Sequence, residues 1–227
     1  MFNLSPTTIL VRALVLFTTM PIHECAHGWV ADKLGDHTAR QAGRLTLNPF
    51  HHLDLFGSIL LLFSGVGWAK PVPVNPYYFT KINRRAGIAL TALAGPMSNI
   101  LMALLTMILY KAVLLLLLPT FLASFLAMVF MVMCVTNLNL AVFNLIPVHP
   151  LDGSRILAFF LPDKALRWID EHEQIIYIIF MMLILFTNIL DGPISFVVNG
   201  IYGFLWKFTA LFMGIKGGRT FDRAAFL

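Results

Sequence analysis

Five apolar stretches of the chain are long enough, or nearly long enough, to cross a lipid bilayer. They cover residues 8–30, 86–118, 120–146, 174–190 and 193–214. A helix needs about 20 residues to span the roughly 30 Å of hydrocarbon in a membrane. The composition agrees, because 59% of the 227 residues are hydrophobic and only 12% are charged, about half the charged fraction of soluble domains. The sequence therefore predicts an all-α integral membrane protein with about five transmembrane helices.

A sixth apolar stretch, residues 53–68, is too short for a comfortable crossing. Its residues would reach about 24 Å as a helix, and it contains three glycines, Gly57, Gly65 and Gly67. It is either a short span or a re-entrant segment. Residues 44–47 alternate polar and apolar side chains, and prolines at positions 71, 73 and 76 exclude a helix there, so we expect short membrane-associated β strands on either side.

The whole chain, residues 1–227, is expected to form a single polytopic membrane domain. We divide it into a core of residues 1–160 and a C-terminal part of residues 161–227, an amphipathic connector followed by a helical hairpin. The first apolar stretch lacks a basic leader and a cleavage site, so we expect it to be retained. Cys25 and Cys134 both lie in apolar segments and do not suggest a disulfide. No basic run interleaved with aromatic residues predicts a nucleic-acid partner.

The most informative polar residues lie in the sequence HECAH, at the end of the first apolar stretch. On a helix, His23 and His27 lie one above the other on the same face, so both can turn a ring nitrogen toward one metal ion. Glu24 lies about 100° around the helix, where it can reach a water molecule in the site without being a ligand. The alternatives are coincidence and structural histidines in a polar bundle interior. Polar side chains at this depth are costly, which favours a zinc site.

A catalytic zinc site usually has three protein ligands, so a third one is needed. Asp152 is the best candidate, because it closes the sequence FNLIPVHPLDG, where Asn144 and the prolines would unwind the end of a helix. The competing interpretation is an ordinary Asp-Gly turn outside the membrane. His27 and Asp152 lie at the exits of two spans. They can share an ion only if residues 53–68 fold back instead of crossing.

The distribution of basic residues supports the same chain path. If residues 53–68 fold back, one face collects nearly all lysines and arginines, whereas the other keeps only Arg12 and Lys111. Cytoplasmic loops are enriched in Lys and Arg. The site is therefore expected to open toward the cytoplasm.

These residues resemble those of the site-2 proteases, a family of intramembrane zinc metalloproteases. HECAH resembles their zinc motif, and NLIPVHPLDG resembles their second motif, whose aspartate supplies the third ligand. The intervening sequences GRLTLNPFHHLDLFGSI, GWAKPVPVNPYYF and LAGPMSN are similar to the compact bacterial branch, which lacks PDZ and CBS domains. The resemblance covers about residues 5–160.

The resemblance implies one Zn²⁺ per chain, held by His23, His27 and Asp152, with Glu24 as catalytic acid and base. It also implies that Asn144 lies beside the metal and steadies the oxyanion. His149 departs from the family pattern, and we interpret it as a bystander or an outer-shell donor, with a rival ligand as the alternative. His51 and His52 are expected in an interfacial loop.

The predicted function is hydrolysis of peptide bonds in or near transmembrane segments of membrane-protein substrates, in the bacterial cytoplasmic membrane. The two extended segments could hold an unwound substrate by strand addition. The alternative is a metal-binding transporter or sensor that uses the same ligands, and a catalytically silent scaffold is a third possibility. Glu24 separates the first two hypotheses, because a transporter would not need it.

Overall fold

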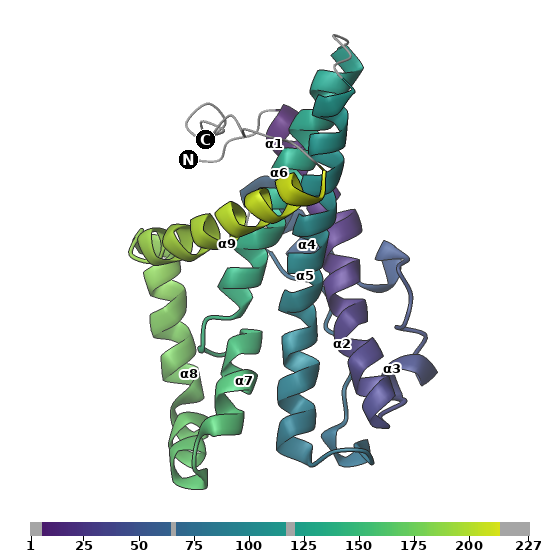
Figure 1. Ribbon diagram of the computed structural model, residues 1–227. Helices are drawn as coiled ribbons and strands as arrows, with labels where there is room; N and C mark the ends of the chain where they lie inside the picture. Colours follow the sequence, from purple (N-terminus) through teal and green to yellow (C-terminus); the bar gives the residue numbers. More distant parts are fainter. Residues whose placement is uncertain (1–5, 65–66, 117–120, 214–227) are drawn as a thin grey trace.

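The computed structural model describes residues 6–64, 67–116 and 121–213. Within this part of the chain, four helical segments are long and apolar enough to cross a membrane: Thr8–Leu34, Arg84–Leu115, Phe121–Asn144 and Asp191–Phe212. The first combines α1 (Pro6–Leu14), a π-helical turn (Val15–Thr19) and α2 (Met20–Leu34), and the others are α5, α6 and α9 (Figure 1). This arrangement agrees with the predicted all-α membrane protein.

The predicted count of about five spans is not confirmed. The stretch 174–190 falls mostly in α8 (Asp163–Phe186), which is not among the four candidate spans of the described residues. The first half of α8 carries six charged residues: Asp163, Lys164, Arg167, Asp170, Glu171 and Glu173. Its apolar second half reaches only about 20 Å at 1.5 Å per residue, too short to cross a bilayer alone.

The sixth apolar stretch folds back on itself. It contains α4 (Leu55–Ser64), and the residues on either side pair through an antiparallel bridge between Leu53 and Ala69. The Lys70 N–H also donates to the His52 carbonyl at 2.8 Å. At the far end of α4, the Arg12 guanidinium donates to the carbonyls of Leu62 and Phe63, both at 2.9 Å. The chain therefore makes an excursion along α1 and returns to where it began.

Because of this return, α5 (Arg84–Leu115) begins at the end of the bundle where α2 stops. Gly35 ends α2 with φ 114°, a conformation that favours glycine, and the Thr80 N–H donates to the Leu34 carbonyl at 3.1 Å. Helix α6 (Phe121–Asn144) then runs back beside α5 (Figure 1). The end of α2 and the end of α6 consequently face the same side, as a shared metal site requires.

The predicted β strands are not confirmed. The described residues contain no strand beyond the single bridge at Leu53 and Ala69. Residues 44–47 form bends and irregular chain between α3 (Thr38–Gln41) and a 3₁₀ turn (Pro49–His51), and residues 70–75 run irregularly to a second turn (Pro76–Tyr78). Prolines in the second segment remove the N–H groups that a ladder would need. His52 also differs from expectation: it is fully buried, and its Nε2 lies 2.8 Å from the Thr46 carbonyl oxygen.

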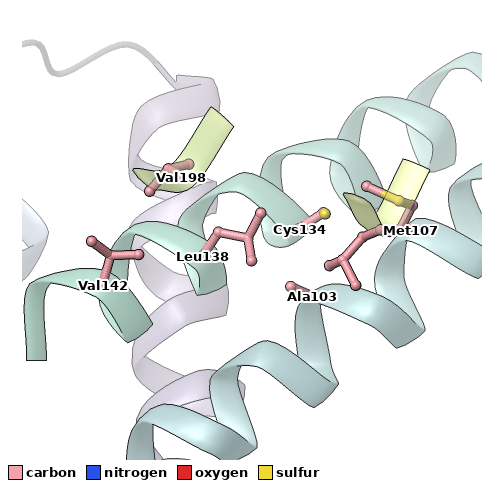
Figure 2. Packing of buried hydrophobic residues seen from close by; sticks show 7 residues of the cluster. Ala103, Met107, Cys134, Leu138, Val142 and Val198 are labelled. Atoms are coloured by element: carbon pink, nitrogen blue, oxygen red, sulfur yellow. The ribbon is translucent and has the colours of Figure 1, made fainter. Parts of the chain in front are cut away.

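The apolar core lies where α5, α6 and α9 (Asp191–Phe212) meet (Figure 2). It consists of small and medium side chains from the three helices: Ala103, Met107, Cys134, Leu138, Val142, Val198 and Leu205. Helix α9 crosses α5 and α6 steeply (Figure 1). Lys111 connects α5 to α9: the lysine is 2% exposed, and its Nζ donates to the Trp206 carbonyl of α9 at 2.6 Å. Cys25 and Cys134 are free thiols, in agreement with the sequence analysis.

Candidate metal centre

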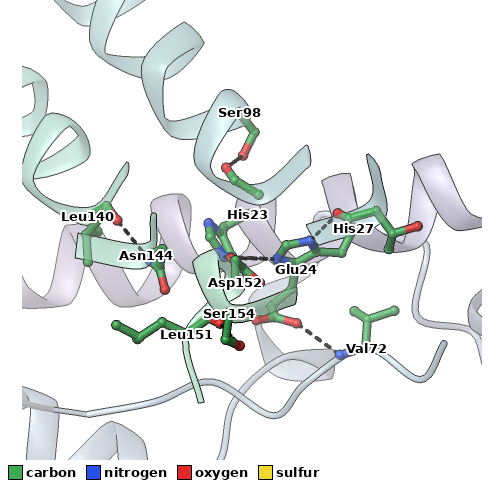
Figure 3. Close-up of polar contacts among 12 residues, drawn as sticks. His23, Glu24, His27, Val72, Ser98, Leu140, Asn144, Leu151, Asp152 and Ser154 are labelled. Atoms are coloured by element: carbon green, nitrogen blue, oxygen red, sulfur yellow. Dashed lines mark hydrogen bonds and ion pairs between the residues drawn. The ribbon is translucent and has the colours of Figure 1, made fainter. Parts of the chain in front are cut away.

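Three side chains predicted as ligands meet at one point between α2, α5 and α7 (Asp152–Phe160) (Figure 3). His23 Nε2 lies 3.0 Å from His27 Nε2. Asp152 Oδ2 lies 3.2 Å from His23 Nε2 and 3.3 Å from His27 Nε2. The structure thus brings together residues separated by about 125 positions in the sequence.

These separations match the dimensions of a zinc site. Zn²⁺ bonds to nitrogen and carboxylate oxygen are about 2.0–2.2 Å long, so two ligand atoms of a tetrahedron lie about 3.3 Å apart. The three observed distances, 3.0, 3.2 and 3.3 Å, are close to the edges of one face of such a tetrahedron. The fourth vertex has no protein ligand among the described residues, which is the arrangement of a catalytic zinc site. The donor set therefore fits the metal.

The hydrogen bond made by His27 Nδ1 determines the tautomer of its ring. His27 Nδ1 lies 2.7 Å from the Thr91 carbonyl oxygen in α5, which can only accept a hydrogen bond. Nδ1 therefore carries the proton of the neutral ring, and the lone pair of Nε2 is free to face the metal. Metal-binding histidines are commonly oriented in this way by their other nitrogen.

The charge of the site depends on Asp152, whose side chain is 15% exposed. Burial raises the pKa of this carboxyl, but in the metal-free site, where the imidazoles can be protonated, hydrogen bonds and charge attraction from His23 and His27 more than offset burial. The pKa of Asp152 therefore lies below its ordinary value, so the carboxylate is ionised near neutral pH and could serve as an anionic ligand. The next residue, Gly153, allows close packing, because a Cβ there would collide with the carbonyls of Leu145 and Ile146. Helix α7 can therefore begin directly against the end of α6.

Glu24 lies beside the cluster and contributes no atom to it. Its Oε2 accepts a hydrogen bond from the Val72 N–H at 2.9 Å (Figure 3). Asn144 is the last residue of α6, and Figure 3 shows it together with the cluster. Its Nδ2 donates to the Leu140 carbonyl of its own helix at 2.9 Å, so the amide points partly away from the cluster.

His149 pairs with α8 and does not join the three candidate ligands. Its Nε2 lies 2.7 Å from Glu173 Oε1 in α8, and it is not part of the metal-binding group found among the described residues. The ion pair joins the loop before Asp152 to α8, and it lines an open surface depression with Pro150, Gln174 and Tyr177.

Gly95 in α5 leaves the space that the two imidazoles occupy. A Cβ at this position would lie 2.5 Å from His27 Cε1 and 2.6 Å from His23 Cε1, closer than carbon atoms can approach. We expect Gly95→Ala to lower zinc affinity about 10–100-fold, the range seen when the support of a metal ligand is disturbed. Zinc content of the purified protein after competition with a chelator measures this effect.

Gly200→Ala in α9 is the matched control, because a Cβ there meets nothing within 4 Å. Both changes replace a helical glycine with a better helix former, so helix propensity cannot explain a difference between them. Equal zinc binding in the two variants would contradict the close packing of α5 against the histidines.

The sequence analysis missed three supports of the site: the Thr91 carbonyl, the space at Gly95 and the Val72 N–H. Two of them are backbone groups, which any residue type supplies and no composition signals. Gly95 stands in the quoted LAGPMSN sequence, but its partner helix could be known only from the fold.

Known proteins resemble the chain in sequence. Residues 119–187 match the model of Peptidase family M50. The chain is 42% identical over 185 residues to a protein of Bacillus subtilis (strain 168) named "Putative zinc metalloprotease YwhC", with 80% of this chain and 82% of that one covered. It is 28% identical over 173 residues to "Putative zinc metalloprotease Rip2" of Mycobacterium tuberculosis (strain ATCC 25618 / H37Rv), covering 75% of this chain and 64% of the relative. No solved structure matches the chain.

The extent of the first match, together with the family model, decides the classification, because more than two thirds of both chains align at an identity well above 30%. The chain belongs to Peptidase family M50, the site-2 protease family of zinc metalloendopeptidases, with Zn²⁺ as its cofactor.

Proposed function

We propose that this zinc metalloprotease cleaves peptide bonds in or near the transmembrane segments of other membrane proteins. The depth of the histidines carries the proposal. His23 and His27 lie eleven and seven residues before the end of the candidate span Thr8–Leu34, which places them about 16 and 10 Å along the helix from that end. A site at this depth favours substrates that are themselves embedded in the bilayer.

His23, His27 and Asp152 are the proposed zinc ligands, and Glu24 is the proposed acid and base. Zinc, when bound, supplies the Lewis acidity that activates a water molecule and polarises the scissile carbonyl. Glu24 takes a proton from the attacking water and delivers it to the leaving nitrogen. The Asn144 amide, after rotating away from Leu140, donates a hydrogen bond to the carbonyl oxygen as negative charge develops on it.

The proposed orientation places the open side of the site toward the cytoplasm of a bacterial cell. Basic residues gather where α2 ends and α5 begins, and there Lys81 Nζ donates to the Lys33 carbonyl at 2.7 Å. Toward the other end of the bundle, Arg12 is bound to α4 and Lys111 is buried against α9. An excess of Lys and Arg at one end is the cytoplasmic pattern.

New protein N-termini in membranes test this function directly. In cells that carry the protein, compared with cells that lack it, we expect N-termini inside or next to apolar segments of about 20 residues. Mass spectrometry of labelled N-termini provides the measurement.

The competing function is metal transport. It would be favoured if no such N-termini appear and if the purified protein carries Zn²⁺ across the membrane of sealed vesicles. The proposal predicts the opposite pair of results: cleavage in cells and no zinc flux in vesicles.

A further inference from the structure

We propose that the backbone N–H of Val72 is a positioning group that holds the Glu24 carboxylate for hydrolysis, an inference that rests on the proposed function. The Val72 nitrogen lies 2.9 Å from Glu24 Oε2, although the two residues are 48 positions apart (Figure 3). The contact connects the irregular segment 70–75 to the helix that carries both histidines.

Within the tripeptide of residues 71–73, only one backbone N–H is available to bind Glu24. Pro71 and Pro73 flank Val72, and proline has no N–H group. Proline also fixes its own φ, and it restricts the preceding residue to extended conformations. The Val72 N–H is therefore the single donor of a stiff tripeptide, and its direction changes little with thermal motion.

Contacts on both sides of Val72 hold the segment in place. The buried guanidinium of Arg44 donates from Nη2 to the Lys70 carbonyl at 2.6 Å and to the Pro71 carbonyl at 3.3 Å. The Asn75 N–H donates to Oδ2 of Asp36, which is fully buried, at 2.6 Å. The donor to Glu24 is thus fixed relative to α2 from two directions.

Gly28 explains how the segment approaches so closely. It lies one helical turn after Glu24, and a Cβ on it would come within 2.9 Å of Val72 Cγ1 and 2.8 Å of Leu45 Cδ2. Because Gly28 has no side chain, the Val72 side chain can pack directly on the surface of α2. The same packing brings the Val72 backbone to Glu24.

The contact gives the two oxygens of the Glu24 carboxylate different roles. An ionised carboxylate accepts hydrogen bonds on both oxygens. With Oε2 held by Val72, Oε1 is left for the proton that passes from water to the leaving nitrogen. A catalytic group held in a productive orientation accelerates the chemical step without binding the substrate more tightly.

Val72→Pro is the direct test, because it replaces the N–H with the proline Cδ, which removes the hydrogen bond and displaces the Glu24 carboxylate from its present position, while the backbone stays extended and compatible with the flanking prolines. Val72→Ala is its control, because it trims the side chain and retains the N–H. The probe is a fusion protein with a single apolar transmembrane segment, reconstituted with the purified enzyme in vesicles. We expect Val72→Pro to lower kcat about ten-fold or more, the factor expected for a lost hydrogen bond to a charged group, with KM and zinc content unchanged. We expect Val72→Ala, which shortens the side chain that packs on Gly28 but keeps the N–H, to lower kcat clearly less than Val72→Pro does.

Hydrogen exchange supplies a readout independent of activity. Because the two prolines carry no N–H, a short peptide around residue 72 reports mainly on the Val72 amide. We expect this amide to exchange about ten-fold or more slowly in the wild type than in Glu24→Ala. Equal exchange rates, or equal kcat for Val72→Pro and Val72→Ala, would overturn the inference. A wild-type enzyme that cleaves no membrane protein would instead overturn the proposed function.

Discussion

Replacing Glu24 with glutamine should leave zinc bound and lower the rate of peptide hydrolysis about 10²–10⁴-fold, the usual contribution of a positioned acid and base. Glutamine has the size and shape of glutamate, and its amide oxygen can still accept the Val72 N–H that now binds Oε2 at 2.9 Å. It cannot take a proton from water at neutral pH. Zinc content by mass spectrometry and cleavage of a reconstituted transmembrane fusion protein measure the two effects separately.

Glu173→Gln is the matched control for this change. Glu173 is a partly exposed carboxylate in α8 that pairs with His149, and the same charge is lost without touching the ligand cluster. We expect near-normal hydrolysis from the control. Glu24→Gln protein that retains full activity would exclude Glu24 as the acid and base. Loss of zinc from Glu24→Gln would show instead that Glu24 is a ligand or supports one.

The relative placement of the two histidines in the candidate site could be predicted from the sequence. In HECAH, the spacing of His23 and His27 by four residues determines that both rings share one face of a helix, and the structure places their Nε2 atoms 3.0 Å apart. This relation is local, so it does not depend on the rest of the fold.

The chain path was predictable for a different reason. Asp152 could join the histidines only if residues 53–68 returned, and the bridge between Leu53 and Ala69 closes that return. Topology has few options when each span must end on one face or the other. A chemical requirement could therefore select among them.

The less predictable features depend on contacts between distant residues. Residues 70–75 were expected to form a strand, but the structure uses their carbonyls and amides to bind Arg44, Glu24 and Asp36. Hydropathy alone also suggested a span at residues 174–190. Helix α8 instead begins at Asp163 and has a charged first half. Only its second half is apolar, and that half is shorter than a membrane span.

Replacing Asp152 with alanine should lower zinc affinity at least about 100-fold, beyond the 10–100-fold that loss of an outer-shell partner costs, and hydrolysis should fall to background. Asp152 supplies the one anionic atom of the cluster, at 3.2 Å from His23 Nε2 and 3.3 Å from His27 Nε2. Without it, two neutral imidazoles on adjacent turns of α2 remain. They form only one edge of the tetrahedron that zinc prefers. Competition with a chelator of known affinity measures the loss.

Two further variants decide what such a loss means. Asp170→Ala removes an exposed carboxylate from α8 and should bind zinc normally, which separates ligand loss from a change in net charge. His149→Ala should also bind zinc normally, because its Nε2 is 2.7 Å from Glu173 Oε1 and His149 is not part of the cluster. The reverse pattern, with zinc lost from His149→Ala and kept by Asp152→Ala, would make His149 the third ligand. The loop before α7 would then have to change its conformation when the metal binds. His149 and Asp152 lie on the same short connection, and only Asp152 is grouped with the two histidines.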